Sequence, residues 1–213
     1  MALENGADAI HPGYGFLSEN ATFAQACEDS GIIFVGPKVS VLKSLGDKIT
    51  AKKVALDNNV PIIRSNDKPL TNIDIAISEA KKIGYPIMLK AASGGGGRGM
   101  RVIREEDELK KAFNESKREA LNAFGDDTVF LEKFVENPKH IEIQIVADSH
   151  GNIVHLFERD CSVQRRYQKV IEFAPSYGLK EKTKQDLYEY AIKRCKAVNY
   201  NNIGTVEFLV DDD

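Results

Sequence analysis

The N-terminal sixty residues alternate between short apolar runs and amphipathic stretches. A short run ends at Ile10, and the stretch ATFAQACEDSG has the spacing of a helix with Ser18 or Asn20 as its N-cap. IIFVGP then has the composition of a buried strand. Strand, loop, helix and strand in this order predict a parallel sheet, although with too few strands to stand alone. Residues 38–60 predict a helical connection that ends in a turn before Pro61.

The pattern between residues 61 and 135 predicts one compact α+β unit. Strands are expected at VPII, YPIMLKA, MRVI and TVFLEKFV, and helices at NIDIAISEAKKIG and over residues 105–124. The second helix should bury one stripe of apolar side chains. The members of this stripe are Leu109, Phe113, Ala120, Leu121 and Phe124.

After Pro138 the pattern changes to long strands whose two faces differ. In HIEIQIVAD the isoleucines fall on one face, and the other face carries His140, Glu142 and Gln144. GNIVHLFERD should pair with it across a turn, followed by one basic strand, VQRRYQKVIEF, and a helix over EKTKQDLYEYAIKRCKAV. In the last strand, IGTVEFLV, Glu207 lies on the face opposite the valines. The domain boundaries predicted on this basis are 1–37, 38–60, 61–135 and 136–213.

The stretch SGGGGRG at 93–99 contains five glycines within six positions, between two predicted strands. Ordering such a run costs conformational entropy, so a folded loop here must close over something. A Walker A loop fails, because Met100 stands where its lysine should be. The dinucleotide pattern G-x-G-x-x-G matches at Gly94, Gly96 and Gly99, but it needs a helix directly afterwards and the β-prone MRVI follows. The flanks fit best a hairpin whose loop N–H groups cover phosphates, with a flexible surface hairpin as the alternative.

Composition narrows the class of protein. Of the 213 residues 42% are apolar and 29% charged, which is typical of a globular protein with a sizeable core. The net charge of −3 and the lack of a long basic run argue against a nucleic-acid partner or a membrane surface. No apolar stretch could span a bilayer, the N-terminus lacks a signal-peptide pattern, and the three cysteines fit neither a disulfide framework nor a metal site. These observations predict a cytoplasmic protein.

Several charged residues interrupt apolar strands. Lys90 lies within IMLKAA just before the glycine loop, where an ammonium group needs a carboxylate or a phosphate; snorkelling to the surface is the alternative. Glu132 and Lys133 interrupt VFLEKFV in the same way, and a solvated edge strand explains them equally well. Glu207 on the last strand is a candidate magnesium ligand, since Mg²⁺ prefers one or two carboxylates together with phosphate oxygens.

A basic cluster surrounds Gln164. Four cations within eleven residues suit a small anion or a phosphate tail, and a salt-bridge network with the acidic residues nearby is the alternative. The cations are Arg159, Arg165, Arg166 and Lys169, and the acidic residues are Glu158, Asp160 and Glu172. The four histidines show no metal-ligand spacing.

The strings HPGYGFLSEN, GDK, GYPIMLKAASGGGGRGM, LEKFVENPKHIEIQIVAD, ERDCSVQRRYQKV and GTVEFL resemble biotin carboxylase, an ATP-grasp enzyme, in order and spacing. HLFERDCSVQRR and IEFAPS look more like the biotin carboxylase domain of pyruvate carboxylase than the acetyl-CoA carboxylase subunit. The resemblance implies an α+β (α/β) ATP-grasp fold. It makes 1–37 a remnant of the N-terminal, parallel-sheet (pre-ATP-grasp) domain and 38–60 a helical connection. Residues 61–135 become the small lid subdomain, and 136–213 the first part of the large subdomain, an incomplete antiparallel sheet.

The resemblance also implies roles for individual residues. ATP would lie between the 61–135 unit and the following sheet, with Lys48 and Lys90 on its phosphates beneath Gly96 and Gly97. Glu207 would be a ligand of Mg²⁺ (or Mn²⁺). Lys169 would help to hold bicarbonate, with Gln164 beside it among the catalytic residues. The remaining nucleotide-binding residues implied are Met100, the adenine-reading hinge Glu132, Lys133, Phe134 and Val135, the ribose-side His140 and Gln164, Tyr167, and Leu209 against the adenine ring.

The implied reaction is phosphorylation of bicarbonate by MgATP to carboxyphosphate, followed by transfer of CO₂ to N1′ of biotin held on a carrier domain. The partners would be ATP, bicarbonate and the biotinylated carrier, and the full-length enzyme would be a homo-oligomer. The family's second magnesium carboxylate, its catalytic arginine and its general-base glutamate have no counterpart in this sequence. We therefore expect an internal fragment that binds nucleotide weakly and does not turn over.

One departure and three alternatives accompany this interpretation. Tyr167 stands where the family commonly has a histidine, so the contact there brings no positive charge. Another ATP-grasp ligase, such as a carbamoyl phosphate synthetase, is an alternative against which RDCSVQRRYQK argues. A non-catalytic nucleotide-binding or interaction module is the second alternative. An oxidoreductase is the third, and it lacks the strand-to-helix glycine turn that a dinucleotide fold needs.

Overall fold

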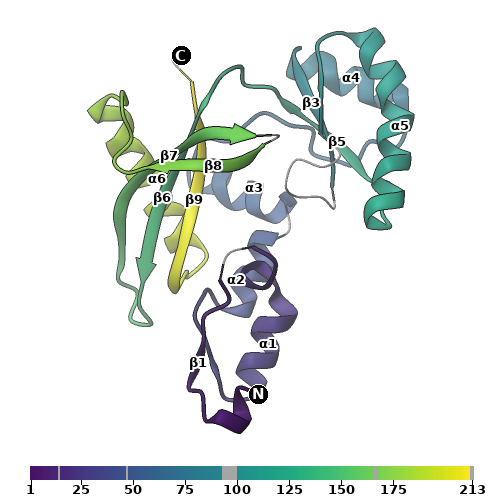
Figure 1. The fold of residues 1–213 in the computed structure, drawn as a ribbon. Helices are drawn as coiled ribbons and strands as arrows, with labels where there is room; N and C mark the ends of the chain where they lie inside the picture. The colour runs from purple at the N-terminus through teal and green to yellow at the C-terminus, as the bar shows by residue number, and fades with distance from the viewer. Residues whose placement is uncertain (14, 47, 93–99, 166, 212–213) are drawn as a thin grey trace. The chain divides into compact units, whose positions relative to one another are not determined.

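The computed structural model describes residues 1–13, 15–46, 48–92, 100–165 and 167–211, without the side chains of residues 48, 49 and 124. Figure 1 shows its helices and strands. The chain divides into two compact units. Unit 1 comprises Met1–Ile62, His140–Asp160 and Phe173–Phe208, and unit 2 comprises Ile63–Lys139, Cys161–Glu172 and Leu209–Asp213. Within the described ranges, no helix is both long enough and apolar enough to cross a membrane.

A short parallel sheet begins unit 1, as predicted. Strand β1 (Ala9–Ile10) pairs parallel with β2 (Ile33–Phe34), and α1 (Ala21–Asp29) connects them. The side-chain oxygen of Asn20 accepts a hydrogen bond from the Phe23 N–H at 2.8 Å, which confirms this residue as the N-cap. Ala24, Cys27, Ile32, Phe34 and Val39 form a small core beside the sheet. Single-turn 3₁₀ helices cover Leu3–Asn5 and Phe16–Glu19.

The connection to unit 2 differs from the prediction in one respect. The predicted helical stretch consists of α2 (Val39–Gly46) and α3 (Lys48–Asp57). The strand predicted at VPII is absent, because residues 60–64 have no regular structure. Proline lacks the N–H that a strand donates to its neighbour, which explains why Pro61 does not enter a ladder. Only the next residue along, Ser65, forms an isolated bridge, and its partner is Glu132.

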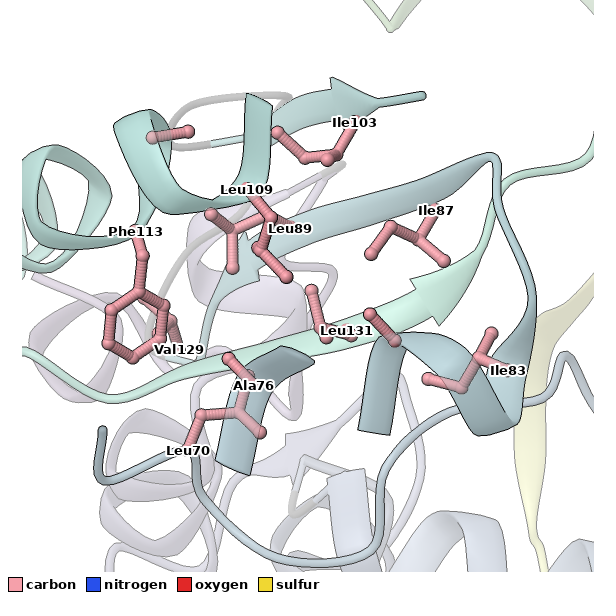
Figure 2. Close-up of a cluster of buried hydrophobic side chains, with 12 residues drawn as sticks. Leu70, Ala76, Ile83, Ile87, Leu89, Ile103, Leu109, Phe113, Val129 and Leu131 are labelled. Atoms are coloured by element: carbon pink, nitrogen blue, oxygen red, sulfur yellow. The ribbon is translucent and has the colours of Figure 1, made fainter. Parts of the chain in front are cut away.

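Unit 2 contains a three-stranded sheet covered on one face by two helices. Its strand order is β4–β3–β5, with β3 (Ile87–Ala91) paired antiparallel to β4 (Met100–Ile103) and to β5 (Val129–Lys133). The helices are α4 (Ile73–Ile83) and α5 (Glu106–Phe124). Figure 2 shows the core between helices and sheet. Its largest members are Leu70, Ile83, Ile87, Leu89, Ile103, Leu109, Phe113, Val129 and Leu131.

One residue of the predicted α5 stripe was assigned wrongly. Leu109, Phe113 and Ala120 are almost fully buried, but Leu121 is 53% exposed. Position 121 lies twelve residues after 109, and a helix turns by about 100° per residue, so this side chain points roughly 120° away from the stripe. Phe124 belongs to the same prediction, and its side chain lies outside the described part.

A four-stranded sheet in the order β8–β7–β6–β9 follows. Its strands are β6 (Lys139–Ala147), β7 (Ile153–Arg165), β8 (Gln168–Phe173) and β9 (Asn202–Val210), and α6 (Glu181–Ala197) lies between β8 and β9 in the chain. β6 and β7 pair antiparallel across a turn, as predicted. The basic segment predicted as one strand is instead divided between β7 and β8. Ile141, Ile143 and Ile145 are completely buried, as their alternation predicts.

A β-bulge shifts the alternation within β7. Ile145 pairs with His155 but Ile143 pairs with Glu158, so two residues of β7 face one residue of β6. Phe157 within this bulge has a φ of 62°. As a result Glu158 lies on the same face as the buried isoleucines, and Arg159 lies on the opposite face.

Hydrogen bonds to the buried carboxylate of Glu158 connect β7 to α6. Glu158 accepts hydrogen bonds from the Tyr188 hydroxyl, from Lys184 Nζ at 2.8 Å and from the Ser176 N–H at 3.2 Å. Burial opposes ionisation, but the hydrogen bonds from Lys184 and Tyr188 outweigh it, so the pKa of Glu158 lies below its ordinary value. Burial first, and then the bond to Glu158, raises the pKa of Tyr188. The carboxylate therefore remains charged inside the fold, held by α6.

We expect Leu109→Ala to lower the free energy of unfolding by about 2–5 kcal/mol, because a completely buried leucine leaves a cavity when truncated. Leu121→Ala is the matched control, since it makes the same change on the same helix at a half-exposed position, and should cost less than about 1 kcal/mol. Urea unfolding followed by circular dichroism measures both. Equal losses would contradict the packing described for α5.

We expect Lys184→Met to destabilise the protein most near neutral pH. The lowered pKa of Glu158 means that the pair stabilises the fold above the unfolded carboxyl pKa of about 4.3, and that this contribution is lost as the pH falls through the folded pKa. The bond to Glu158 raises the pKa of Lys184, so the contribution is also lost above about pH 10.4. The gap in urea midpoint between wild type and variant should therefore narrow below pH 4.

Lys193→Met is the control for this prediction, because it removes an exposed ion pair with Glu189 from the same helix. Its effect should be several-fold smaller than that of Lys184→Met and nearly independent of pH. A Lys184→Met effect that is no larger, or that persists undiminished at pH 3, would show that Glu158 is not held as described.

Candidate functional site

One face of the β4–β3–β5 sheet packs on the helices, and its other face carries the predicted nucleotide contacts Lys90, Met100 and Glu132. Cross-strand register places these side chains together, since Lys90 is opposite Met100 and Met88 is opposite Glu132. This non-core face, as the structure describes it, consists of Met88, Lys90, Met100, Val102, Phe130 and Glu132.

Lys90 and Glu132 form an ion pair on this non-core face. The ammonium group donates a hydrogen bond to the Glu132 carboxylate, and the two side chains are 25% and 22% exposed. Their neighbours on the face are apolar, so the pair lies in a less polar setting than a surface ion pair. The requirement that Lys90 should find a carboxylate or a phosphate is therefore met, in this structure, by a carboxylate.

The end of β5 and the residue after it are held by hydrogen bonds to Arg64 and to residues 84–86, which precede β3. The Lys133 N–H donates to the Arg64 carbonyl at 2.7 Å, and the Phe134 N–H donates to the Pro86 carbonyl at 3.1 Å. The Lys133 side chain donates to the carbonyls of Gly84 at 3.0 Å and Tyr85 at 2.9 Å, just after α4 ends. The Lys133 side chain is therefore held against the backbone that connects α4 to β3.

Three of the predicted phosphate contacts fall partly or wholly outside the described residues. Gly96 and Gly97 are among them, and so is the Lys48 side chain, although its backbone begins α3. The flanks of the glycine run are described, and they pair antiparallel with Lys90 opposite Met100. The flanks therefore form the strand pair that the hairpin template requires.

On the face opposite its buried isoleucines, the four-stranded sheet carries the predicted site residues His140 and Glu207 and one member of the predicted basic cluster, Arg159. We call this face of the sheet the polar face, and its members are His140, Glu142 and Gln144 on β6, Arg159 on β7 and Glu207 on β9. Arg159 donates to Glu142 at 2.7 Å and to Gln144 at 2.8 Å. Gln144 in turn donates to the Gly204 carbonyl of β9 at 3.0 Å. These bonds cross three strands and fix the polar face.

Three side chains of the polar face have the arrangement of a cation site. The Nε2 atom of His140 lies 3.6 Å from a carboxylate oxygen of Glu207. One ligand atom each of His140, Glu142 and Glu207 lies within 4.8 Å of the others. Mg²⁺ prefers carboxylate oxygens, so the carboxylates of Glu142 and Glu207 fit the metal that the resemblance implies, whereas the imidazole nitrogen of His140 is not a ligand that Mg²⁺ prefers. Sequence spacing could not reveal the group, because Glu207 comes from a strand far away in the chain.

The predicted basic cluster is divided by the fold. Arg159 belongs to the polar face, while Arg165, Gln168, Lys169 and Val170 line a hollow of about 370 Å³ at the β7–β8 connection. Arg166 lies outside the described residues. The hollow is cationic and amide-lined, which suits a small anion. Gln168 also lines the hollow, although no pattern in the sequence pointed to it.

The remaining predicted contacts lie near the ends of β7 and β9. Gln164 donates to the Cys161 carbonyl at 3.0 Å. Tyr167, in the connection to β8, has a φ of 63° and is 50% exposed. Leu209 is 42% exposed and alternates onto the same side of β9 as Glu207. Val135 is half-buried.

Two protein-family models match the chain. "Biotin carboxylase, N-terminal domain" matches residues 1–42, and "Carbamoyl-phosphate synthase L chain, ATP binding domain" matches residues 47–213. A biotin carboxylase of Halalkalibacterium halodurans and a pyruvate carboxylase of Staphylococcus aureus are each 51% identical to the whole chain. The chain spans 47% of the first protein and 18% of the second.

A solved structure shares the fold. It is the biotin carboxylase domain dimer of 2-oxoglutarate carboxylase from Hydrogenobacter thermophilus, in complex with MgADP, ADP and bicarbonate. The match has 47% identity and a TM-score of 0.91, and it covers 99% of this chain and 47% of that one. The chain is therefore similar, along its full length, to about half of that domain.

We expect Arg159→Lys to lower the free energy of unfolding by about 1–3 kcal/mol. Lysine keeps the charge but lacks the planar fork that bonds Glu142 and Gln144 together, so at least one charge-assisted hydrogen bond to a buried partner is weakened. Arg118→Lys, on an exposed position of α5, is the control and should change stability by less than about 0.5 kcal/mol. A loss no larger than the control, measured by urea unfolding, would contradict the cross-strand role of Arg159.

Proposed function

Because the chain belongs to the ATP-grasp family and, within it, to the biotin carboxylases, we propose that it binds MgATP. As part of a longer protein it would provide the nucleotide site for the ATP- and bicarbonate-dependent carboxylation of biotin held on a carrier domain. One observation carries the proposal above the others. Lys90 and Glu132 lie together on a sheet face that is otherwise apolar, beside the strand that leaves the glycine run.

This face has the chemistry that a nucleotide needs. Lys90 would neutralise phosphate charge, together with Lys48 and the N–H groups of Gly96 and Gly97. Glu132 would accept a hydrogen bond from the exocyclic amino group of adenine, and the segment through Lys133, Phe134 and Val135 would follow the edge of the base. Met100 and Leu209 would pack on the ring. The observed bonds of Lys133 to Gly84 and Tyr85 support a fixed position for that segment.

The polar face would hold the divalent cation. Glu142 and Glu207 supply suitable carboxylates with His140 close to them, and Glu207 is the most exposed of the three. A Mg²⁺ ion bound here would offset the negative charge that develops on the transferring phosphoryl group. Arg159 would keep the Glu142 carboxylate in place, and His140 would also lie on the ribose side of the nucleotide.

The hollow at the β7–β8 connection would take bicarbonate. Lys169 supplies an ammonium group and Arg165 a guanidinium group, while Gln168 supplies an amide that can donate to an anion oxygen. Gln164 precedes this hollow on β7. Tyr167 can donate one hydrogen bond from its hydroxyl group, and it brings no positive charge to the connection.

The resemblance to longer enzymes extends the proposal to partners. Biotin would be presented by a biotinylated carrier domain, and the full-length protein would form a homo-oligomer. The biotin carboxylase domain of the Hydrogenobacter thermophilus enzyme is a dimer, and this similarity supports the second point.

The test is a thermal shift with MgATP on the wild type and on Lys90→Met. At about a hundred times its Kd, a ligand that binds only the folded state adds roughly 2.7 kcal/mol, so the wild type should be clearly stabilised. The shift should fall strongly in Lys90→Met, because the phosphates lose a cation. Lys117→Met removes a lysine of similar exposure (22%) from α5 and should retain the full shift.

NAD and GTP serve as ligand controls in the same experiment and should shift the wild type less than ATP. A folded wild type that MgATP does not stabilise would contradict the proposal. So would a shift that is equal in wild type and Lys90→Met, since the phosphates would then lie elsewhere.

A further inference from the structure

Among the described residues of the non-core face, one cation and one anion are present, and they are paired with each other. Lys90 comes from the central strand β3 and Glu132 from the neighbouring strand β5, two positions out of direct register. Diagonal neighbours at this spacing are within reach of long side chains. The other four members of the face, Met88, Met100, Val102 and Phe130, carry no charge and cannot compete for either partner.

The pair has an energetic consequence for any anion that approaches Lys90. Each side chain is about three-quarters covered, so the attraction between the two charges is less screened than it is at an exposed surface. A phosphate that approaches Lys90 therefore meets an ammonium group that is already paired with the Glu132 carboxylate, and it competes with that carboxylate for the cation. Displacement leaves the carboxylate without its cation in a partly apolar setting, and this is costly unless a new donor reaches it.

We propose that the Lys90–Glu132 ion pair is a built-in competitor for phosphate, so that phosphate and base are recognised jointly. This inference rests on the proposed nucleotide site and adds a role for Glu132 beyond contact with the base. A bare polyphosphate displaces the carboxylate and leaves it unsatisfied. A nucleotide whose base carries a donor group satisfies the carboxylate at the moment when Lys90 leaves it. The pair therefore discriminates against polyphosphates that carry no base.

A polyphosphate without a base can test whether Glu132 competes for Lys90, because such a ligand makes no contact of the kind that adenine would make with Glu132. We would measure Mg-tripolyphosphate affinity by isothermal titration calorimetry for the wild type, Glu132→Gln, Lys90→Met and the double variant. If Glu132 competes for Lys90, Glu132→Gln should bind tripolyphosphate about tenfold more tightly, the factor that corresponds to 1.4 kcal/mol. The gain should disappear when Lys90 is methionine. The four proteins form a double-mutant cycle, which isolates the part of the binding free energy that depends on the interaction between Lys90 and Glu132.

Two further variants complete the design. Glu106→Gln removes a carboxylate of the same unit that pairs with Lys81 and Lys110, and it should leave tripolyphosphate affinity unchanged. Glu132→Asp keeps the charge and draws it back from Lys90, so it should give an intermediate gain and replaces Glu132→Gln if that variant does not fold.

The outcomes separate the inference from the proposed function. No gain in Glu132→Gln, or a gain that persists with methionine at position 90, overturns the competitor role even if MgATP binds. A Lys90-dependent gain supports the competitor role even in a protein that MgATP fails to stabilise, and in that case the nucleotide proposal fails together with the joint recognition of phosphate and base.

Discussion

One inserted residue in β7 determines how charge is distributed over the four-stranded sheet. The bulge shifts the alternation, so Glu158 lies on the face of the buried isoleucines, where Lys184 satisfies it, and Arg159 lies opposite, bonded to Glu142. Without the shift these two neighbours would exchange faces. An arginine would then lie among isoleucines and Glu158 would lie beside Glu142, and both arrangements bury unpaired charge. The polar face, and the cation site that it offers, depend on this local irregularity.

Local sequence pattern was enough to predict much of the fold. Strict alternation in HIEIQIVAD identified the buried face of β6, and capping chemistry narrowed the start of α1 to Ser18 or Asn20, of which Asn20 is the N-cap. The pattern could not predict which β7 side chains beyond the bulge point to each face of the sheet. A glycine often marks a bulge, but this one contains Phe157, and the composition of the strand stays β-prone throughout. VPII was mistaken for a strand because the prediction followed its apolar, β-prone composition. It did not take into account that Pro61 has no N–H group to donate to a neighbouring strand. Leu121 was mistaken for a core residue because it is apolar, although it points away from the stripe.

The candidate site shows the same limit. The sequence predicted that Lys90 meets a phosphate or a carboxylate, with snorkelling to the surface as the alternative, and only strand register revealed Glu132 as its partner. The gathering of His140 and Glu207 depends on β6 and β9 lying side by side, which no local pattern encodes. Lys133 was placed with the base-reading segment, and sequence could not show that its side chain bonds to the carbonyls of Gly84 and Tyr85. Charged groups in this protein are thus placed by pairing across strands, and the ligand chemistry that we propose uses the same groups.

The most direct measurement is amide NMR of the ¹⁵N-labelled protein with MnATP in place of MgATP. Mn²⁺ broadens signals near it, so an ion bound at the polar face should bleach the amides of His140 and Glu207 most strongly. The Asp148–Asn152 turn lies at the far end of β6, and its signals should survive. Two results would contradict the account. The signals of His140 and Glu207 would stay sharp while MnATP binds, or the bleaching would be centred on the turn. In either case the cation would lie away from the polar face.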